Sequence, residues 1–397
     1  MFKNRFFRAY GFWHWGEGFQ TVLFTWYMAF HANLTATEIG FYQALVLSPF
    51  LVFTIFGGAL TDRVGAGLSY IMSTSIFAAI LITYGFMDLQ FGFVPELFFL
   101  YCVGAGIVSA FSNPAIDTFI PDATDQPVQD NSLLAATAHN IAKLTGNVSG
   151  LLLPLLSATG GFVVNGILMA ISVIFLQTHQ RRRDGHSPNY VDHSDLQPGV
   201  FRRIILHYRN CPENLDILLS SALLGLIIVP AGYILVPLIL RERFPEYGNM
   251  IALIGISSWI GAILTTAAAK QMSAKIVRPG AVSLGVWGGY GAGLLILINV
   301  NSFPAFCLII CIFGGVKVGK ALVYGKYLHN SPVNDRGLIV AVDQTAFWGL
   351  ATLGTAGMGV LVDMIGLNTT IMLTSGCILC GVAILMIRGH LSTMVPA

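Results

Sequence analysis

Charged side chains are scarce in this sequence. Asp, Glu, Lys and Arg make up 10% of the 397 residues, and hydrophobic residues make up 55%, whereas about 25% of a typical soluble domain is charged. A soluble fold of this length would lack the polar surface to cover itself, so we predict an integral membrane protein with most of its residues in the lipid bilayer. The formal net charge is only +2, and no basic stripe stands outside the loops, so we expect no nucleic-acid partner.

Signatures of catalysis are missing as well. The sequence contains no His-Glu-x-x-His, no Gly-x-Ser-x-Gly and no phosphate-binding loop, so neither hydrolysis nor ATP use has support, and we predict that the protein is not an enzyme. Five of the six cysteines lie inside apolar runs, where neither a disulfide framework nor a solvated metal site is expected. We therefore expect no metal and no cofactor.

Long apolar runs dominate what is present. Runs of about 20 apolar residues, separated by charges, prolines or turn residues, predict an all-α membrane protein with twelve transmembrane helices. The expected spans are 8–30, 38–60, 68–87, 96–117, 131–155, 160–178, 215–240, 248–269, 280–299, 304–326, 338–361 and 367–388. One long polar stretch separates six spans from six.

The polar stretch divides the chain into three predicted parts. Residues 1–178 form an N-terminal six-helix bundle, residues 179–214 a linker, and residues 215–397 a C-terminal six-helix bundle. Within the linker, VFRRIILHYRN alternates aliphatic and basic residues at helical spacing. It predicts a short amphipathic helix, lying either on the inner membrane surface or in solvent.

Basic residues predict the orientation of the spans. Most of the 21 Lys and Arg residues fall in the connections on one side, and such residues favour the cytoplasmic side. We therefore expect both termini to be cytoplasmic, in a multi-pass protein of the cell inner membrane. The apolar segment after the basic N-terminus contains Glu17 and no small-residue cleavage site, so we interpret it as an uncleaved first span.

A short motif after the second expected span connects the chain to a known family. The segment GGALTDRVGAG, with Gly58, Asp62, Arg63 and Gly65, resembles the G-x-L-x-D-R-x-G signature of the major facilitator superfamily (MFS). The resemblance implies two six-helix bundles around a central cavity that opens alternately to each side. It also implies a latch on the cytoplasmic side, formed by the carboxylate. The basic pair that usually follows the motif is Ala-Gly here.

Longer segments resemble one branch of that superfamily. NPAIDTFIPD, NSLLAATAHNIAKLTGNVSGLLL and GFVVNGILMAISVIFL are similar to the bacterial branch that contains the enterobactin exporter and the macrolide efflux proteins. The resemblance implies proton-driven export of an amphiphilic organic molecule, a siderophore or a drug, by a protein that we expect to be a monomer. Import of a metabolite and flipping of a lipid are the alternatives for the same fold. The fourth span lacks the arginine that other proton-coupled drug exporters often carry there.

Polar and charged residues inside spans are costly and mark candidate functional positions. The candidates for proton coupling and the central cavity are Glu17, His14, Gln20, His139, Asn140, Lys143, Lys317, Asp343 and Gln344. At a rise of about 1.5 Å per residue, Glu17 and His139 lie about 12 Å from the inner surface and Lys143 about 18 Å. The three side chains can therefore share one tier of the bundle.

Two interpretations of these charges stay open. Glu17 is either a proton-carrying carboxylate served by histidines that titrate near neutral pH, or half of a static ion pair with Lys143. Lys317 is either a cavity residue or a lysine that reaches the inner surface.

The aromatic residues of the first span either line a pocket for planar substrates or pack between helices. The glycine runs of spans nine and ten predict close helix packing.

The proposed latch can be tested directly. If Asp62 closes the cytoplasmic side, Asp62→Asn will shift the resting population toward the inward-open state and slow transport with little loss of folded protein. Labelling of single cysteines placed in the cavity measures the shift. Unchanged accessibility would remove the latch role.

Overall fold

The computed structural model describes most of the chain as helices joined by short connections. It describes residues 4–49, 65–120, 123–124, 128–180, 200–272, 275–332 and 336–395. Within these ranges there are helices and no strand. The all-helical prediction is confirmed.

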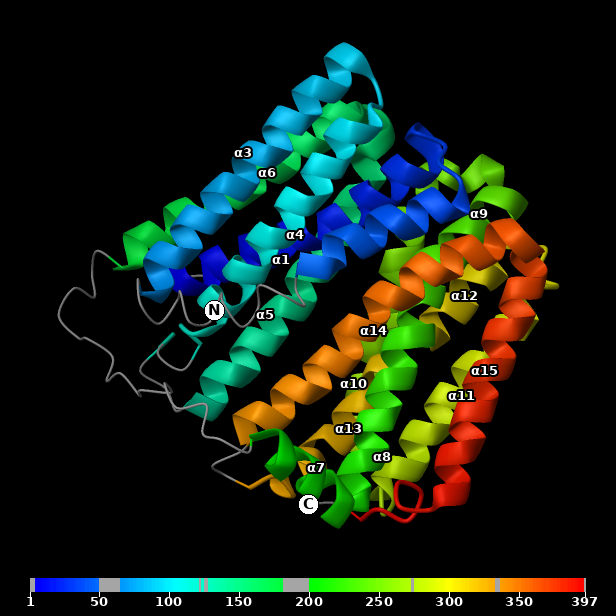
Figure 1. Ribbon diagram of the computed structural model, residues 1–397. Helices are drawn as coiled ribbons and strands as arrows, with labels where there is room; N and C mark the ends of the chain where they lie inside the picture. Colours follow the sequence, from blue (N-terminus) through cyan, green and yellow to red (C-terminus); the bar gives the residue numbers. More distant parts are fainter. Residues whose placement is uncertain are drawn as a thin grey trace. The chain divides into compact units, whose positions relative to one another are not determined.

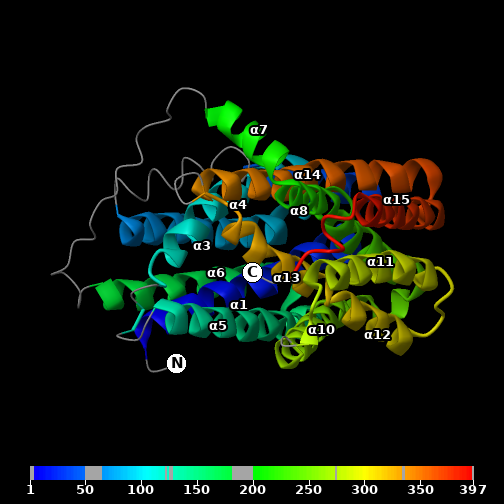
Figure 2. The same cartoon turned by 90° about the horizontal axis from the view of Figure 1, so that it is seen from below.

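Contacts within the chain define two compact units, and the first contains Met1–Tyr190 with Leu240–Ile256. Its elements are α1 (Arg5–Trp26), the π-helix η1 (Tyr27–His31), a helix over residues 36–49, α3 (Ala66–Phe91), α4 (Pro95–Asp117), α5 (Val128–Ser149), the 3₁₀ turn η2 (Gly150–Leu152), α6 (Leu153–Gln180) and the 3₁₀ segment η5 (Pro245–Met250). α1 packs against both α5 and α6, and α3 packs against α4 and α6. Figure 2 shows α1 running beside α5 and α6.

The second unit contains Val191–Ile239 and Ser257–Ala397. Its elements are α7 (Val200–Asn210), α8 (Pro212–Leu223), the π-helical turns η3 (Leu224–Ile228) and η4 (Ala231–Leu235), α11 (Pro279–Leu297), α12 (Phe303–Phe313), α13 (Val316–His329), α14 (Arg336–Ile365) and α15 (Leu367–Arg388). Two helices, α9 (Val236–Arg243) and α10 (Ala252–Gln271), contribute residues to both units. α11 packs against α13 and α15, and α14 against α8 and η3, as the neighbouring ribbons of Figure 1 show for α11 and α15.

Nine helices among the described residues are long and apolar enough to cross a membrane. α1 is not among the nine. Glu17, His14 and Gln20 lower its mean hydropathy, and so do its Trp, Tyr and Gly residues. The number of twelve spans, the boundaries of the three parts and the cytoplasmic termini stay predictions. The linker segment at 200–210 is helical.

Expected spans are interrupted, or separated from one another, at residues that break a regular helix. The expected tenth span is two helices, α12 and α13, which meet at Gly314 and Gly315. Ser157, with φ of +61°, makes the bend in α6 that separates the expected fifth and sixth spans. Pro230 stands between η3 and η4, where a residue without an amide hydrogen cannot complete the regular ladder.

Glycines bring the backbones of α1 and α5 into contact. A β-carbon added at Gly18 would lie 2.5 Å from the carbonyl oxygen of Lys143, and one added at Gly146 would lie 2.6 Å from the amide nitrogen of Phe19. Both obstacles are backbone atoms, which cannot move aside as a flexible side chain can. Close helix approach through small residues is the usual way in which helices associate in lipid.

Gly18→Ala and Gly146→Ala should therefore each destabilise the fold, because the added methyl group must push α1 and α5 apart. We expect a loss of roughly 1 to 3 kcal/mol, the usual cost of overpacking a tight contact. Thermal unfolding in detergent measures the loss. The matched control is Gly11→Ala on α1, where an added β-carbon meets nothing within 4 Å; equal Tm values for all three variants would contradict the close contact.

Candidate functional site

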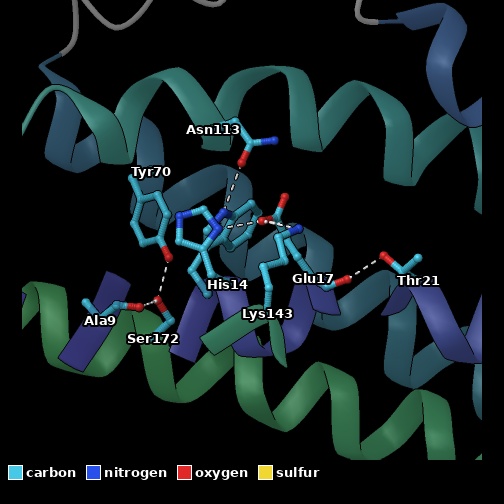
Figure 3. Close-up of polar contacts among 9 residues, drawn as sticks. Ala9, His14, Glu17, Thr21, Tyr70, Asn113, Lys143 and Ser172 are labelled. Carbon is cyan, nitrogen blue, oxygen red and sulfur yellow. Dashed lines mark hydrogen bonds and ion pairs between the residues drawn. The ribbon is translucent and has the colours of Figure 1, made fainter. Parts of the chain in front are cut away.

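The site in the first unit is centred on one carboxylate oxygen of Glu17. Glu17 Oε2 lies 2.9 Å from Lys143 Nζ and 2.6 Å from His14 Nδ1. The side chains of Glu17 and Lys143 are 21% and 16% exposed. Figure 3 shows His14 and Glu17 projecting from α1 toward Lys143, which comes from α5. The structure thus brings together the two charges that the sequence placed in one tier.

Helix geometry explains why these three side chains meet. His14 and Glu17 are three residues apart on α1 and lie on one face. Gly18 faces the backbone of Lys143, so the turn of α1 that carries Glu17 lies against the turn of α5 that carries Lys143. A charge in an apolar bundle is stable only when it is paired, and each side chain here provides the other's counter-charge.

His14 links this pair to a second histidine. The His14 ring lies between Tyr10 and His139, with centroid distances of 4.3 and 4.2 Å and edge-on geometry in both cases. His14 is 5% exposed, and within the described part of the chain its Nε2 atom has no hydrogen-bond partner. Two imidazoles in contact beside a carboxylate can hold and pass a proton.

Gln20 and Asn140, two other predicted residues of the first unit, do not bond to the ion pair within the described residues. Gln20 donates to the hydroxyl of Tyr101 and accepts from the amide of Asn165. Asn140 is half-buried on α5, and within the described residues it makes no hydrogen bond to Glu17 or Lys143. Gln20 therefore belongs to a separate polar network between α1, α4 and α6.

A second ion pair lies in the second unit. Asp343 is fully buried, accepts a hydrogen bond of 2.5 Å from Ser221 Oγ and lies 3.0 Å from Lys320 Nζ. Lys320 also lies over the ring of Phe347, 4.3 Å from its centroid. Gln344 is exposed and shares a hydrogen bond with Tyr324.

Lys317 is elsewhere in this unit. Its ammonium lies 3.4 Å from the ring centroid of Trp259, in a cation–π contact between α13 and α10. The partner of Asp343 is thus Lys320 and not the lysine that the sequence singled out. A glycine-rich helix start, GGVKVGK, carries both lysines, which are three positions apart in the sequence.

The motif GGALTDRVGAG lies only partly within the described residues. Gly58, Asp62 and Arg63 lie outside the described residues. Gly65 has φ of +86° and directly precedes α3, a backbone conformation that favours glycine.

Most aromatic rings of α1 pack between helices. Trp13 and Phe19 are fully buried, and Trp13 donates to Asn113 on α4 at 2.9 Å. Phe12 stacks on both Trp15 and Phe175. The packing interpretation of these rings accounts for their positions.

The family model of the Major Facilitator Superfamily matches residues 7–355. The chain belongs to this superfamily. No curated protein sequence matches it at a significant level.

Solved transporter structures share the fold of this MFS protein. A variant of the nucleoside transporter NupG has 15% identity and a TM-score of 0.77, with 97% of this chain and 98% of that chain covered. A peptide transporter POT in complex with sulfate has 11% identity and a TM-score of 0.75, with 99% and 95% covered. A POT family transporter in complex with 5-aminolevulinic acid has 12% identity and a TM-score of 0.73, with 96% and 95% covered.

The prediction of the family is therefore confirmed. At these identities the solved structures establish the fold and not the substrate. The superfamily and its fold are those of transporters and not of enzymes. The narrower resemblance to the branch of the enterobactin exporter stays a prediction.

Several charged contacts of this MFS protein were not predicted from its sequence. Tyr27 donates to the buried Asp88, and His31 lies 3.5 Å from the same carboxylate. Asp216, fully buried at the start of α8, pairs with Arg388 Nε at 2.6 Å. Asp88, Asp216 and Arg388 stand at or just beyond the ends of expected spans. Each of these charged residues lies within one helical turn of the end of an apolar run. This position is the feature of the sequence that could have identified them as members of charged contacts.

The Glu17–Lys143 pair can be tested by a double-mutant cycle. Replacing either residue alone, by Glu17→Gln or Lys143→Met, leaves one uncompensated charge and should cost roughly 3 to 5 kcal/mol, while the double variant should cost less than the sum. Thermal unfolding in detergent measures all three. Lys270→Met, at an exposed position at the end of α10, is the control for loss of a lysine, and strictly additive losses would show that Glu17 and Lys143 do not interact.

Proposed function

We propose that the protein is a secondary transporter that exports an amphiphilic organic molecule, a siderophore or a drug, from the cytoplasm in exchange for protons. The observation that carries this proposal is the carboxylate of Glu17, shared between Lys143 and His14 within a bundle of apolar helices. Ionisable groups inside membrane helices mark proton and substrate pathways. The superfamily of the chain provides the transport fold in which such a group works.

The proposal includes an arrangement of the chain in the membrane. Twelve spans form two six-helix bundles, 1–178 and 215–397, joined by the linker 179–214, with both termini in the cytoplasm and the chain in the inner membrane as a monomer. The nine long apolar helices and the basic residues gathered in connections of one side support it. The substrate site lies near the midplane, as in other transporters of this architecture.

The charges of the Glu17–Lys143 pair indicate how uptake of a proton affects the pair. The ion pair consists of a carboxylate and an ammonium, so protonation of Glu17 removes the counter-charge of Lys143. We infer that uptake of a proton and separation of the pair occur together. His14, in contact with both Glu17 and His139, is placed to deliver the proton and to take it away.

The alternatives differ in direction and cargo. A metabolite importer of the same fold would accumulate its substrate in whole cells, and a lipid flippase would need a lateral opening between helices. The segments that resemble exporters favour export, and no specific contact in the described residues favours either alternative.

The decisive variant is Glu17→Gln, which keeps the shape of the side chain but cannot carry a proton. Exchange of substrate for substrate needs only the binding site and the conformational change, whereas efflux driven by a pH gradient needs the proton site. We expect Glu17→Gln in proteoliposomes to lose gradient-driven efflux and to keep equilibrium exchange. Enterobactin and the macrolide erythromycin are the two transport probes, and Glu96→Gln, an exposed carboxylate in the first turn of α4, is the control.

Two other outcomes would each contradict this role. Loss of both activities would make Glu17 a binding or folding residue. Retention of both would place the proton elsewhere, with Asp343 as the next carboxylate to replace.

A further inference from the structure

Residues 240–256 form a tight seam with α1, η1, α5 and η2 inside the first unit. Three small residues on successive turns of this segment, Gly248, Ala252 and Gly255, each meet one residue of those elements, namely Phe30, Gly150 and Asn147. A β-carbon at Gly248 would lie 2.6 Å from the ring of Phe30, and one at Gly150 would lie 3.2 Å from the β-carbon of Ala252.

A hydrogen bond holds the same segment at the end of the seam. Arg241 Nη1 donates to the carbonyl oxygen of Leu34 at 2.5 Å and approaches that of Ala29 at 3.5 Å. Ala29 belongs to η1, where the wider π-helical turn leaves backbone carbonyl groups in need of partners. The seam therefore has both shape complementarity and a charge-assisted bond.

Asn147 is the residue that joins this seam to the ion pair. It is 1% exposed, and its Nδ2 atom donates to the carbonyl oxygen of Lys143 at 2.8 Å. Its Oδ1 atom occupies the place that a β-carbon at Gly255 would take. The carbonyl of Lys143 in turn faces Gly18, next to Glu17. One buried amide thus touches residue 255 on one side and the backbone of Lys143 on the other.

We propose that Asn147 is a positioning residue that couples closure of the seam to the Glu17–Lys143 pair. While residues 240–256 are seated, Gly255 holds the amide in the orientation that binds the carbonyl of Lys143 and keeps this turn of α5 against Gly18. When the segment leaves, the amide loses that support and the turn is free to move away from Glu17. Coupling of this kind is reciprocal, so separation of the pair by a proton loosens the seam.

This inference rests on the proposed proton site at Glu17. The other titratable and charged groups that face Glu17 are Tyr10 and His14 from α1, Tyr70 from α3, Asp117 from α4 and Lys143 from α5. His139 from α5 faces His14. Asn147 does not titrate itself, so its effect on any pH profile must act through these groups.

The test uses a cysteine that reports on the seam. Ile251 is 5% exposed within the segment, so Ile251→Cys, in full-length protein whose six native cysteines are replaced by serine, reacts with a membrane-impermeant maleimide only when the seam opens. In this background we expect labelling to become faster as the pH falls. Asn147→Ala should abolish that dependence. The ratio of the labelling rate at low pH to the labelling rate at high pH should change about fivefold, as expected for loss of one hydrogen bond.

A second variant tests the contact independently of the proton. Gly255→Ala should open the seam at every pH, because its methyl group takes the place of Asn147 Oδ1, and Asn147→Ala combined with Gly255→Ala should close it again. Gly11→Ala, with open space around the added group, is the control. A double variant that labels as fast as Gly255→Ala, or an Asn147→Ala variant that keeps the full pH dependence, would overturn the proposal.

Glu17→Gln in the same background separates the two claims. If its labelling stays pH-dependent while Asn147→Ala removes the dependence, the proton site lies elsewhere and Asn147 still couples the seam to it. If Glu17→Gln removes the dependence and Asn147→Ala does not, the proton site stands and the role of Asn147 is wrong.

Discussion

The close approach of α1 and α5 is the constraint on which the site depends. Because Gly18 and Gly146 have no side chain, the backbones meet directly, and a carboxylate and an ammonium from opposite helices reach each other at 2.9 Å. In a wider interface the two charges would stand apart in an apolar bundle, at a cost of several kcal/mol each. Packing and charge therefore support each other, since the contact pairs the charges and the pair adds an attraction to a contact made by small residues.

The second unit repeats this helix contact with different chemistry. Gly225 of η3 faces the carbonyl of Phe347 on α14, as Gly18 faces that of Lys143 on α5. Four residues earlier on both helices, the first unit has His14 against His139, and the second has Ser221 bonded to Asp343. Asp343 is fully buried, whereas the side chain of Glu17 is 21% exposed. Because the carboxylate of Glu17 is the less enclosed of the two, our proposal places the exchangeable proton in the first unit.

Sequence patterns predicted the helical fold, the family and the candidate pair, because apolar runs and isolated charges within them are local signals. The glycine run of the tenth span was correctly interpreted as packing, since Gly314 faces the backbone of Ser258. Periodicity cannot show which of two nearby lysines meets Asp343, because Lys317 and Lys320 lie on one helix and their partners come from others. The seam at Gly255 was equally invisible, since it joins residues more than 100 positions apart.

The central claim is that Glu17 takes up a proton when its pair with Lys143 separates. Infrared difference spectroscopy of the reconstituted protein, titrated across the pH range in which a gradient drives transport, tests this most directly. The account predicts a protonated carboxyl band that grows as the pH falls and is missing in Glu17→Gln but present in Glu96→Gln. A spectrum in which no such band belongs to Glu17, at any pH where the protein stays folded, would show a static ion pair and contradict the account.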